Sequence, residues 1–596
     1  MAGFILLAAV GLRAAPAGKA DNGDSIALLV SPGDPAPGKP LRVLAAAENE
    51  IEKAQIQVRG PGGKVSGSKL KSGGGPPFWW SAEFPVASEG SYEISLVFRG
   101  KALATTELRV GGPVSQAAVA AASGNLAHGW NRRWEDLYSA WIDALFSEAD
   151  ERASWRTLHE VTRDPARNIL YNHLGLGEDD PSNRSPVVME PDCADCPFFL
   201  RAYFAWKLGL PFGFHETDRG TLERAPRPGR WLTSLFLPRR GNEIASFNAM
   251  LRNVMNAVHS GTARTRLDDD ASDDYPVPLS RTALRPGVVF ADPYGHTLVI
   301  VRWVPQTGDR AGQMLAVDAQ PDGTVGLKRF WKGNFLFETS GVVGEPGFKA
   351  FRPIVLDGKT PRLLSNREIA ADPGYGDFSL QQKGMPPPAF YDTMERLMNP
   401  KPLDPEAAFR EQFEGLHEQL IVRVESVANG EAYMTSHPGT IIPMPGTASG
   451  LFLAGGPWED FSTPNRDLRL LIAMDAVLEF PDKVVRSPDL YRLPKRRTPG
   501  EVKSGLANLA AKWGRELSIT YVRSDGATQV LSIEDILKRT DALEMAYNPN
   551  DGIEIRWGAP PGSSELSSCR RRAPASQLEK MKAMRSWFRK RLHPPT

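Results

Sequence analysis

Cysteine is scarce in this chain of 596 residues, which contains only Cys193, Cys196 and Cys569. Three thiols are too few for a disulfide-stabilised scaffold, and an odd number leaves at least one unpaired unless it bonds another chain. An excess of one charge is also lacking, because the formal net charge is +1, and we expect no nucleic-acid partner. Beyond the first residues, no apolar run approaches the roughly 18 residues of a membrane-spanning helix.

The length exceeds what one hydrophobic core supports, so three or four domains are expected. The 55 glycines and 50 prolines indicate many turns and few long helices. An apolar run, Phe4–Leu12, precedes the small residues Ala15-Pro16-Ala17, a pattern typical of a secretory signal peptide and its cleavage site. No Lys or Arg precedes the run, so a disordered or truncated start is the alternative. We expect export to the periplasm or cell surface, with residues 1–20 as the signal peptide.

Residues 24–113 consist of short, partly alternating segments separated by turn clusters such as Ser31-Pro32-Gly33-Asp34-Pro35. Strands punctuated in this way predict a β-sandwich. The region resembles the immunoglobulin-like modules that bacteria place before surface enzymes, although it has no Cys-Trp-Cys signature. We expect strands at residues 27–30, 41–44, 54–58, 92–97 and 103–110.

The stretch from Pro191 to Pro211 contains two of the three cysteines. Cys193 and Cys196, each preceded by an aspartate, lead into an apolar segment, Phe198–Leu208, which predicts a buried helix. A thiolate at a helix N-terminus is favoured by the helix dipole and by free backbone N–H groups. The same N–H groups can stabilise an oxyanion formed by thiolate attack on a carbonyl. This position therefore suits a nucleophile.

A histidine and an aspartate occupy corresponding places in two later strands. His296 follows a predicted glycine turn and begins a segment with a clear strand pattern, and Asp318 lies at the end of the next predicted strand. If the two strands form a hairpin, His296 and Asp318 lie opposite one another, and the carboxylate fixes the imidazole tautomer. The strands are predicted at residues 287–291, 296–304 and 313–319, and an amphipathic helix at residues 134–146.

The order of a cysteine at a helix start, a histidine at a strand start and an aspartate at the next strand end resembles the papain-like superfamily. The Asp192-Cys193 pair and the Gly209-Leu210-Pro211 exit look like the transglutaminase-like branch. Arg285-Pro286-Gly287-Val288-Val289-Phe290, before His296, resembles the NlpC-type cell-wall peptidases. The likeness covers residues 120–350 and implies an α+β catalytic fold in which His296 activates a cysteine and Asp318 orients the ring.

The sequence leaves open which cysteine attacks. The distance in sequence from Cys193 to Gly209-Leu210-Pro211 is near that of the transglutaminase-like branch, whereas the shorter distance from Cys196 is nearer that of the NlpC-type branch. Cys196 also precedes Pro197, a residue that suits a first helical turn. We favour Cys193, and the long interval before His296 implies an insertion over the cleft. Three alternatives compete: a thiol–disulfide redox pair, a metal site that includes His215, and a degenerate papain-like domain that only binds.

The remaining sequence is read from composition. Pro386-Pro387-Pro388 and Pro400-Lys401-Pro402 indicate loops, and a basic helix closes the chain at Gln577–Leu592. Its apolar stripe suits either a membrane or polyanion surface or, as we favour, packing on the last domain. The predicted segments are the signal peptide at 1–20, the immunoglobulin-like sandwich at 24–113, the papain-like domain at 118–360, a loop-rich α+β region at 365–500, and a small α+β domain with the basic helix at 501–596.

Together these features predict an exported, cysteine-dependent hydrolase or acyltransferase that acts on amide bonds. Its catalytic residues would be Cys193 or Cys196, with His296 and Asp318. We expect a peptide or cell-wall substrate, an envelope contact through the basic helix as an additional option, and neither cofactor nor metal. A non-catalytic surface binding or assembly protein is the alternative.

Overall fold

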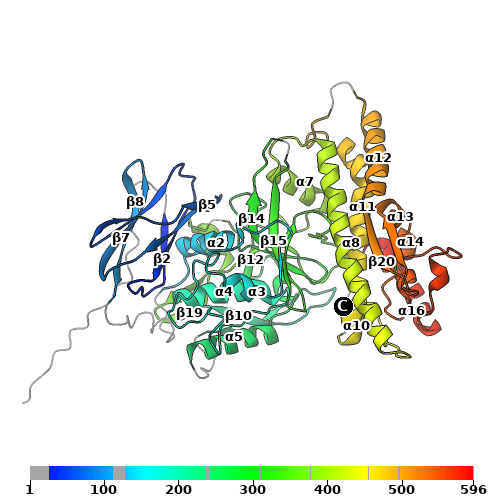
Figure 1. The fold of residues 1–596 in the computed structure, drawn as a ribbon, viewed down its shortest axis with the longest axis horizontal. Coiled ribbons are helices and arrows are strands. Elements are labelled where there is room, and N and C mark those ends of the chain that lie inside the picture. Colours follow the sequence, from blue (N-terminus) through cyan, green and yellow to red (C-terminus); the bar gives the residue numbers. More distant parts are fainter. Residues whose placement is uncertain are drawn as a thin grey trace, which may run out of the picture.

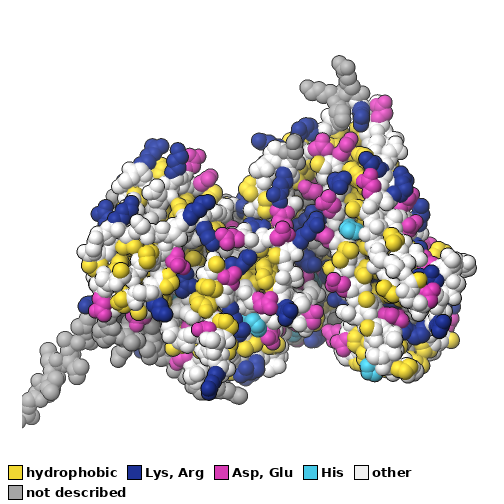
Figure 2. Space-filling view, in the orientation of Figure 1, with side chains coloured by type: hydrophobic (Ala, Val, Ile, Leu, Met, Phe, Trp, Pro, Cys, Tyr) yellow, Lys and Arg dark blue, Asp and Glu magenta, His cyan; other side chains and the backbone are white. Residues whose placement is uncertain are grey.

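The computed structural model describes residues 26–111, 128–234, 242–308, 310–372, 374, 375, 377–453, 455–493 and 497–594. The predicted signal peptide lies outside these residues. The described part is a multidomain α+β protein with antiparallel sheets toward its N-terminal end and long helices toward its C-terminal end (Figure 1). None of the helices in the described ranges combines the length and hydrophobicity needed to cross a membrane. Basic and acidic side chains are interspersed on the face shown in Figure 2, in line with the small net charge.

Two four-stranded antiparallel sheets form the N-terminal sandwich, which comprises residues 26–111. Their strand orders are β1-β2-β6-β5 and β4-β3-β7-β8. One buried cluster, which includes Val43, Trp80 and Ile94, joins the two sheets. The five predicted strands are all present. The strand bounds are β1 Ala27–Ser31, β2 Pro40–Ala47, β3 Gln55–Gly60, β4 Gly63–Val65, β5 Lys71–Gly74, β6 Phe78–Pro85, β7 Gly90–Phe98 and β8 Lys101–Val110.

The outer face of the first sheet is covered by helix α2 (Arg132–Phe146), which forms where an amphipathic helix was predicted. Trp79 of the sandwich belongs to the same buried cluster as Trp141 of α2. Arg42 reinforces the contact by donating to the carbonyl oxygens of Asn168 at 3.2 Å and Tyr171 at 2.5 Å. The sandwich therefore shares a hydrophobic core with the region that follows it.

A seven-stranded antiparallel sheet with the order β12-β17-β13-β14-β15-β16-β9 forms the centre of the molecule. Alternate side chains of β14 and β15 pack on opposite faces of this sheet. Val299 and Val317 join the cluster that contains helices α2 and α4. Leu298 and Ala316 join a second cluster, which contains residues of α7. The bounds are β9 Ser154–Trp155, β12 Asp274–Pro276, β13 Val289–Ala291, β14 Thr297–Val304, β15 Gln313–Ala319, β16 Val325–Arg329, β17 Gly347–Phe351 and α7 Pro387–Met398.

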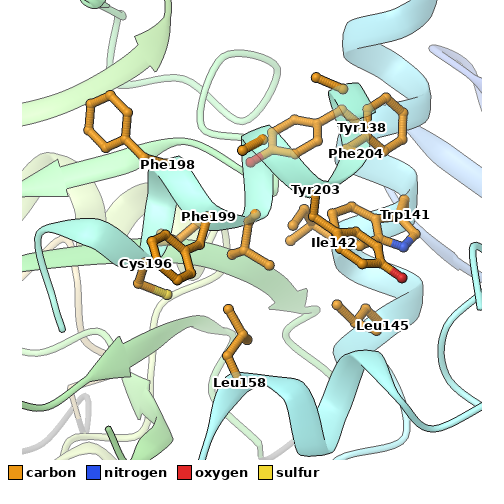
Figure 3. Packing of buried hydrophobic residues seen from close by; sticks show 14 of the residues in the cluster. Tyr138, Trp141, Ile142, Leu145, Leu158, Cys196, Phe198, Phe199, Tyr203 and Phe204 are labelled. Carbon is orange, nitrogen blue, oxygen red and sulfur yellow. The ribbon is translucent and has the colours of Figure 1, made fainter. Parts of the chain in front are cut away.

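Helix α4 (Asp195–Leu208) is the buried helix predicted from the apolar run after the cysteines, and it starts three residues earlier than predicted. Its aromatic side chains pack against α2, where Tyr203 stacks on Trp141 with ring centroids 5.7 Å apart (Figure 3). Its two cationic side chains are paired in the interior: Arg201 forms a bidentate ion pair with Glu135, and Lys207 lies 2.5 Å from Glu178. Pairing offsets the cost of burying these charges.

The segment between α4 and the central strands contains the hairpin β10 (Gly213–Thr217) and β11 (Pro228–Thr233), followed by α5 (Glu243–Ala257). Phe247 of α5 stacks on Trp206, in the last turn of α4, with centroids 4.2 Å apart. Helix α5 thus packs at the opposite end of α4 from the cysteines. Another part of the insertion reaches the turn before His296, because Arg264 donates to the Pro293 carbonyl.

The prediction of loop-rich structure at residues 365–500 is wrong, because most of the described part is helical. Pro387 and Pro388, which suggested a loop in the sequence, instead occupy the first turn of α7, where the missing N–H group would have no intrahelical partner. Pro400 and Pro402 do lie in the connection between α7 and α8 (Pro405–Ser436). Asp404 caps α8 by accepting the N–H groups of Glu406 and Ala407. The helices that begin with proline are α7, α8, α10 (Pro457–Phe461), α11 (Pro464–Arg486) and α12 (Pro499–Glu516).

One buried cluster spans the whole helical region and extends into the last part of the chain. The predicted division at residue 500 therefore does not separate two cores. Helix α16 (Ala575–Lys590) turns Met581 and Phe588 of its apolar stripe into this cluster, and Arg585 pairs with Glu544 at 2.6 Å. The buried stripe leaves little apolar surface for a membrane contact. The other elements here are β20 Ser518–Val522, β21 Thr528–Ser532, α13 Ile533–Leu537, α14 Thr540–Leu543 and α15 Ile553–Arg556.

The shared core predicts that the sandwich and the central region unfold together. Trp79→Ala should lower the free energy of unfolding by about 3–5 kcal/mol, since it removes a large buried side chain from that core. Chemical denaturation monitored by tryptophan fluorescence should show one shifted transition. Arg59→Ala, at an exposed position of β3, is the control and should change the midpoint little. Two separate transitions, only one of them shifted, would contradict the shared core.

Candidate active site

Cys193 lies in a tight turn that leads directly into α4. Oδ1 of Asp192 accepts the N–H groups of Ala194 at 2.8 Å and Asp195 at 3.0 Å, and the Asp192 carbonyl accepts the N–H of Cys196 at 3.0 Å. Asp192 thereby caps the helix and holds Cys193 in the turn. These three N–H groups are occupied, which corrects the expectation that the start of the helix offers free donors to an oxyanion.

The turn Asp292–Gly295, between β13 and β14, presents His296. Gly295 adopts φ +93°, a left-handed conformation that side-chain-bearing residues rarely occupy. The N–H of Asp292 donates to the His296 carbonyl at 2.8 Å. The next residue, Thr297, donates its hydroxyl to the Cys193 carbonyl and so fastens the start of β14 to the cysteine turn.

His296 and Asp318 form an ion pair in which Nε2 lies 2.6 Å from Oδ1. The prediction placed these two residues directly opposite one another, but in the structure they are diagonal neighbours. The strand register pairs Val299 with Val317, and its continuation places Asp318 level with Leu298. The imidazole therefore reaches back across the strands. Since Nε2 faces the carboxylate, Nδ1 is the ring nitrogen left for a thiol.

The charges around His296 favour the protonated ring. Burial alone would lower the pKa of His296, but the Asp318 carboxylate and the Cys193 sulfur, which is within hydrogen-bonding reach, outweigh it and raise the pKa from 6.5 to about 10. Burial would raise the pKa of Asp318, yet the adjacent imidazolium holds it below its ordinary value. Gln320 completes the group by donating from Nε2 to Oδ2 of Asp318 at 2.7 Å.

The two cysteines differ in their surroundings, and they are not joined by a disulfide. Cys193 is half-buried and lies beside His296. Cys196 is 2% exposed and lies among the apolar side chains near Phe199 (Figure 3). Burial and the negative charge of Asp318 raise the pKa of Cys196 well above its ordinary value. These surroundings favour a neutral thiol at Cys196, whereas Cys193 is the cysteine placed beside the imidazole.

A second histidine–carboxylate pair lies away from the cysteine turn. Nδ1 of His215 is 2.7 Å from Oδ1 of Asp273, and both side chains are buried. Within the described ranges, no group of three or more His, Cys, Asp and Glu side chains is arranged to hold a metal ion. The hypothesis of a metal site formed by Cys193, Cys196 and His215 therefore lacks structural support.

Three residues around the site were missed in the sequence. Thr297 directly follows His296, and Gln320 lies two residues after Asp318, so closeness in the sequence to the predicted site residues could have identified both. Arg469 is different: its Nη2 lies 2.7 Å from Oδ2 of Asp292. Arg469 belongs to α11, far along the chain, and no local pattern links it to the site.

Comparison of this chain with models of protein families, with curated proteins and with solved structures finds no match.

The ion pair predicts how His296 titrates. Asp318→Asn removes the negative charge beside the ring, so the pKa of His296 should fall well below 10, which NMR titration of the imidazole measures. Asp322→Asn, in the next turn, is the control and should leave the titration near that of the unmodified protein.

The same shift fixes the sign of a pH effect on stability. Because the pKa of His296 is raised from 6.5 to about 10, the stabilisation is fully present below pH 6.5 and is lost as the pH rises through about 10. An unchanged His296 titration in Asp318→Asn would contradict this account of the pair.

Proposed function

We propose that this protein is a cysteine-dependent hydrolase or acyltransferase that acts on amide bonds. The observation that carries the proposal is the His296–Asp318 pair at 2.6 Å, with the Cys193 sulfur also in contact with the imidazole. A partly buried imidazole held by a carboxylate and placed beside a thiol at a helix start is the arrangement that activates a cysteine nucleophile. Cys193 is the nucleophile in this proposal, and Cys196 is a structural thiol.

The reaction follows from the positions of the three side chains. The Cys193 thiolate attacks the carbonyl carbon of an amide, and the carbonyl π electrons move to the oxygen. When the tetrahedral species collapses, the C–N bond breaks, and the His296 imidazolium gives its proton to the departing amine. A thioester on Cys193 remains. Neutral His296 then takes a proton from water or from an incoming amine as that nucleophile attacks the thioester carbon. The C–S bond breaks, which releases a carboxylic acid or a new amide and restores the Cys193 thiolate beside the His296 imidazolium.

Asp318 stabilises the imidazolium and keeps Nδ1 directed at the sulfur. The N–H groups of Ala194, Asp195 and Cys196 are bonded to Asp192. The N–H of Cys193 is therefore the backbone donor of this turn that we assign to the oxyanion. Backbone donors preorganised in this way are a large source of rate acceleration in acyl transfer.

The architecture supports a papain-like assignment for the catalytic region. Helix α4 packs against the antiparallel sheet whose strands β14 and β15 bring His296 and Asp318 to the helix start. We further propose that the sandwich is immunoglobulin-like, that the protein is exported, and that its substrate is an envelope peptide such as a cell-wall peptide. The last two proposals rest on the signal-like N-terminus and on the resemblance to NlpC-type and transglutaminase-like proteins.

Thiol labelling tests the proposal. With iodoacetamide at neutral pH, Cys193 should react faster than Cys196 or Cys569, as peptide mapping by mass spectrometry would show. His296→Ala should slow labelling of Cys193 by about tenfold or more, because the thiolate loses its cationic partner. Cys196→Ala should leave the rate at Cys193 largely unchanged.

Two controls accompany this experiment. Cys569→Ala removes a thiol outside the site, and His437→Ala removes an exposed histidine at the end of α8; neither should affect Cys193. Equally slow labelling of Cys193 with and without His296 would indicate a non-catalytic binding or assembly protein instead. Preferential reaction of Cys196 would reverse the assignment of the nucleophile.

A further inference from the structure

The turn that presents His296 is held from outside the central sheet. Asp292, at its first position, is fully buried. Oδ1 of Asp292 accepts the N–H of Tyr294 at 2.6 Å, and Oδ2 pairs with Arg469 of α11 at 2.7 Å. Since the N–H of Asp292 also bonds the His296 carbonyl, one residue links Arg469 to the backbone of the candidate general base.

Arg469 stands on a rigid part of the C-terminal region. Its neighbours Leu468 and Leu470 are buried in the helical core. Asp467 forms a buried bidentate pair with Arg423, with distances of 2.8 and 3.0 Å. The backbone around Arg469 is therefore fixed, and its guanidinium can act as a firm anchor for the Asp292 carboxylate.

A second contact joins the same turn to the end of the chain. The ring of His593 stacks on Tyr294, with centroids 5.5 Å apart, and packs against Phe452 at 4.1 Å. From within the central region, Nη1 of Arg264 donates to the carbonyl of Pro293 at 2.9 Å. The turn is thus clamped on one side by the central region and on the other by the C-terminal region.

We propose that Arg469 is a positioning residue of the candidate active site, and that the C-terminal region completes this site by fixing the turn that presents His296 to Cys193. The inference rests on the proposed function. It assigns the C-terminal region a part in catalysis: without Arg469, the buried Asp292 carboxylate loses its ion-pair partner and keeps only the longer-range attraction of Arg264, which is unfavourable. The turn then relaxes, and His296 moves relative to the sulfur.

Arg469 also acts through charge. Together with Lys328 it adds positive potential at Asp318, which contributes to holding the pKa of that carboxyl below its ordinary value. The titratable and charged groups near the His296–Asp318 pair therefore include Cys193, Cys196, Lys328 and Arg469. Loss of Arg469 changes both the placement and the charge balance of the pair.

The test compares the rate of Cys193 alkylation by iodoacetamide, over a range of pH, in the full chain and in its variants. Arg469→Ala should slow alkylation by about tenfold or more, as expected for a small displacement of a catalytic group, and should shift the pH profile. Arg469→Lys keeps a cation within reach of Asp292 and should recover much of the rate. Arg466→Ala removes an exposed arginine of the same helix and should behave like the unmodified protein.

A double-mutant cycle distinguishes positioning from a general loss of structure. Asp292→Asn keeps an acceptor for the N–H of Tyr294 but removes the charge that Arg469 anchors. If the two residues act as one unit, Asp292→Asn combined with Arg469→Ala should be no slower than the slower single variant. Independent, multiplying effects would overturn the proposal.

Each remaining outcome also has a defined meaning. An unmodified rate and pH profile in Arg469→Ala would overturn the inference. If Arg469→Ala does not fold, as judged by circular dichroism, Asp292→Asn decides: slowed alkylation supports the inference, and an unmodified rate rejects it. Alkylation that is insensitive to His296→Ala would instead reject the proposed function itself, so the two failures are distinguishable.

Discussion

The ion pair between His296 and Asp318 is the interaction on which the candidate site depends. A cation and an anion 2.6 Å apart in a largely dehydrated site stabilise each other only while both remain in place. Asp318 raises the pKa of His296 and occupies its Nε2, which leaves Nδ1 for Cys193. The scaffold around the pair preserves this geometry: Thr297 fastens the histidine strand to the cysteine turn, Asp192 caps the cysteine turn, and Arg469 anchors the histidine turn.

Residues far apart in the chain meet at this site because three layers converge on it. The turn that leads into α4 supplies the thiol, the strands β14 and β15 and the turn before β14 supply the carboxylate and the imidazole, and α11 supplies an anchor. The N-terminal sandwich stabilises the first layer indirectly, since Trp79 and α2 share the core that buries α4. The chain therefore behaves less like a catalytic domain with separate appendages than like connected regions that each constrain one active site.

Much of the central region could be predicted from sequence because its signals are local. The apolar run after the cysteines and the alternating strands around His296 and Asp318 determine their own secondary structure. The choice between Cys193 and Cys196 could not be made, since it depends on burial by distant side chains. The region beyond residue 365 was predicted to be loop-rich partly because Pro387 and Pro388 resemble a loop signal, yet they occupy the first turn of α7. Arg469 was invisible to local patterns, because its partner Asp292 meets it only through tertiary packing.

The most direct test of the central claim is capture of the covalent intermediate. The protein is mixed with p-nitrophenyl acetate, quenched rapidly in acid, and mapped by mass spectrometry for the acetylated residue. This account predicts a thioester on Cys193 whose formation is fast, depends on His296, and is followed by release of acetate or by transfer to an added amine. Acetylation confined to surface lysines, or found on Cys196 while Cys193 stays free, would contradict it.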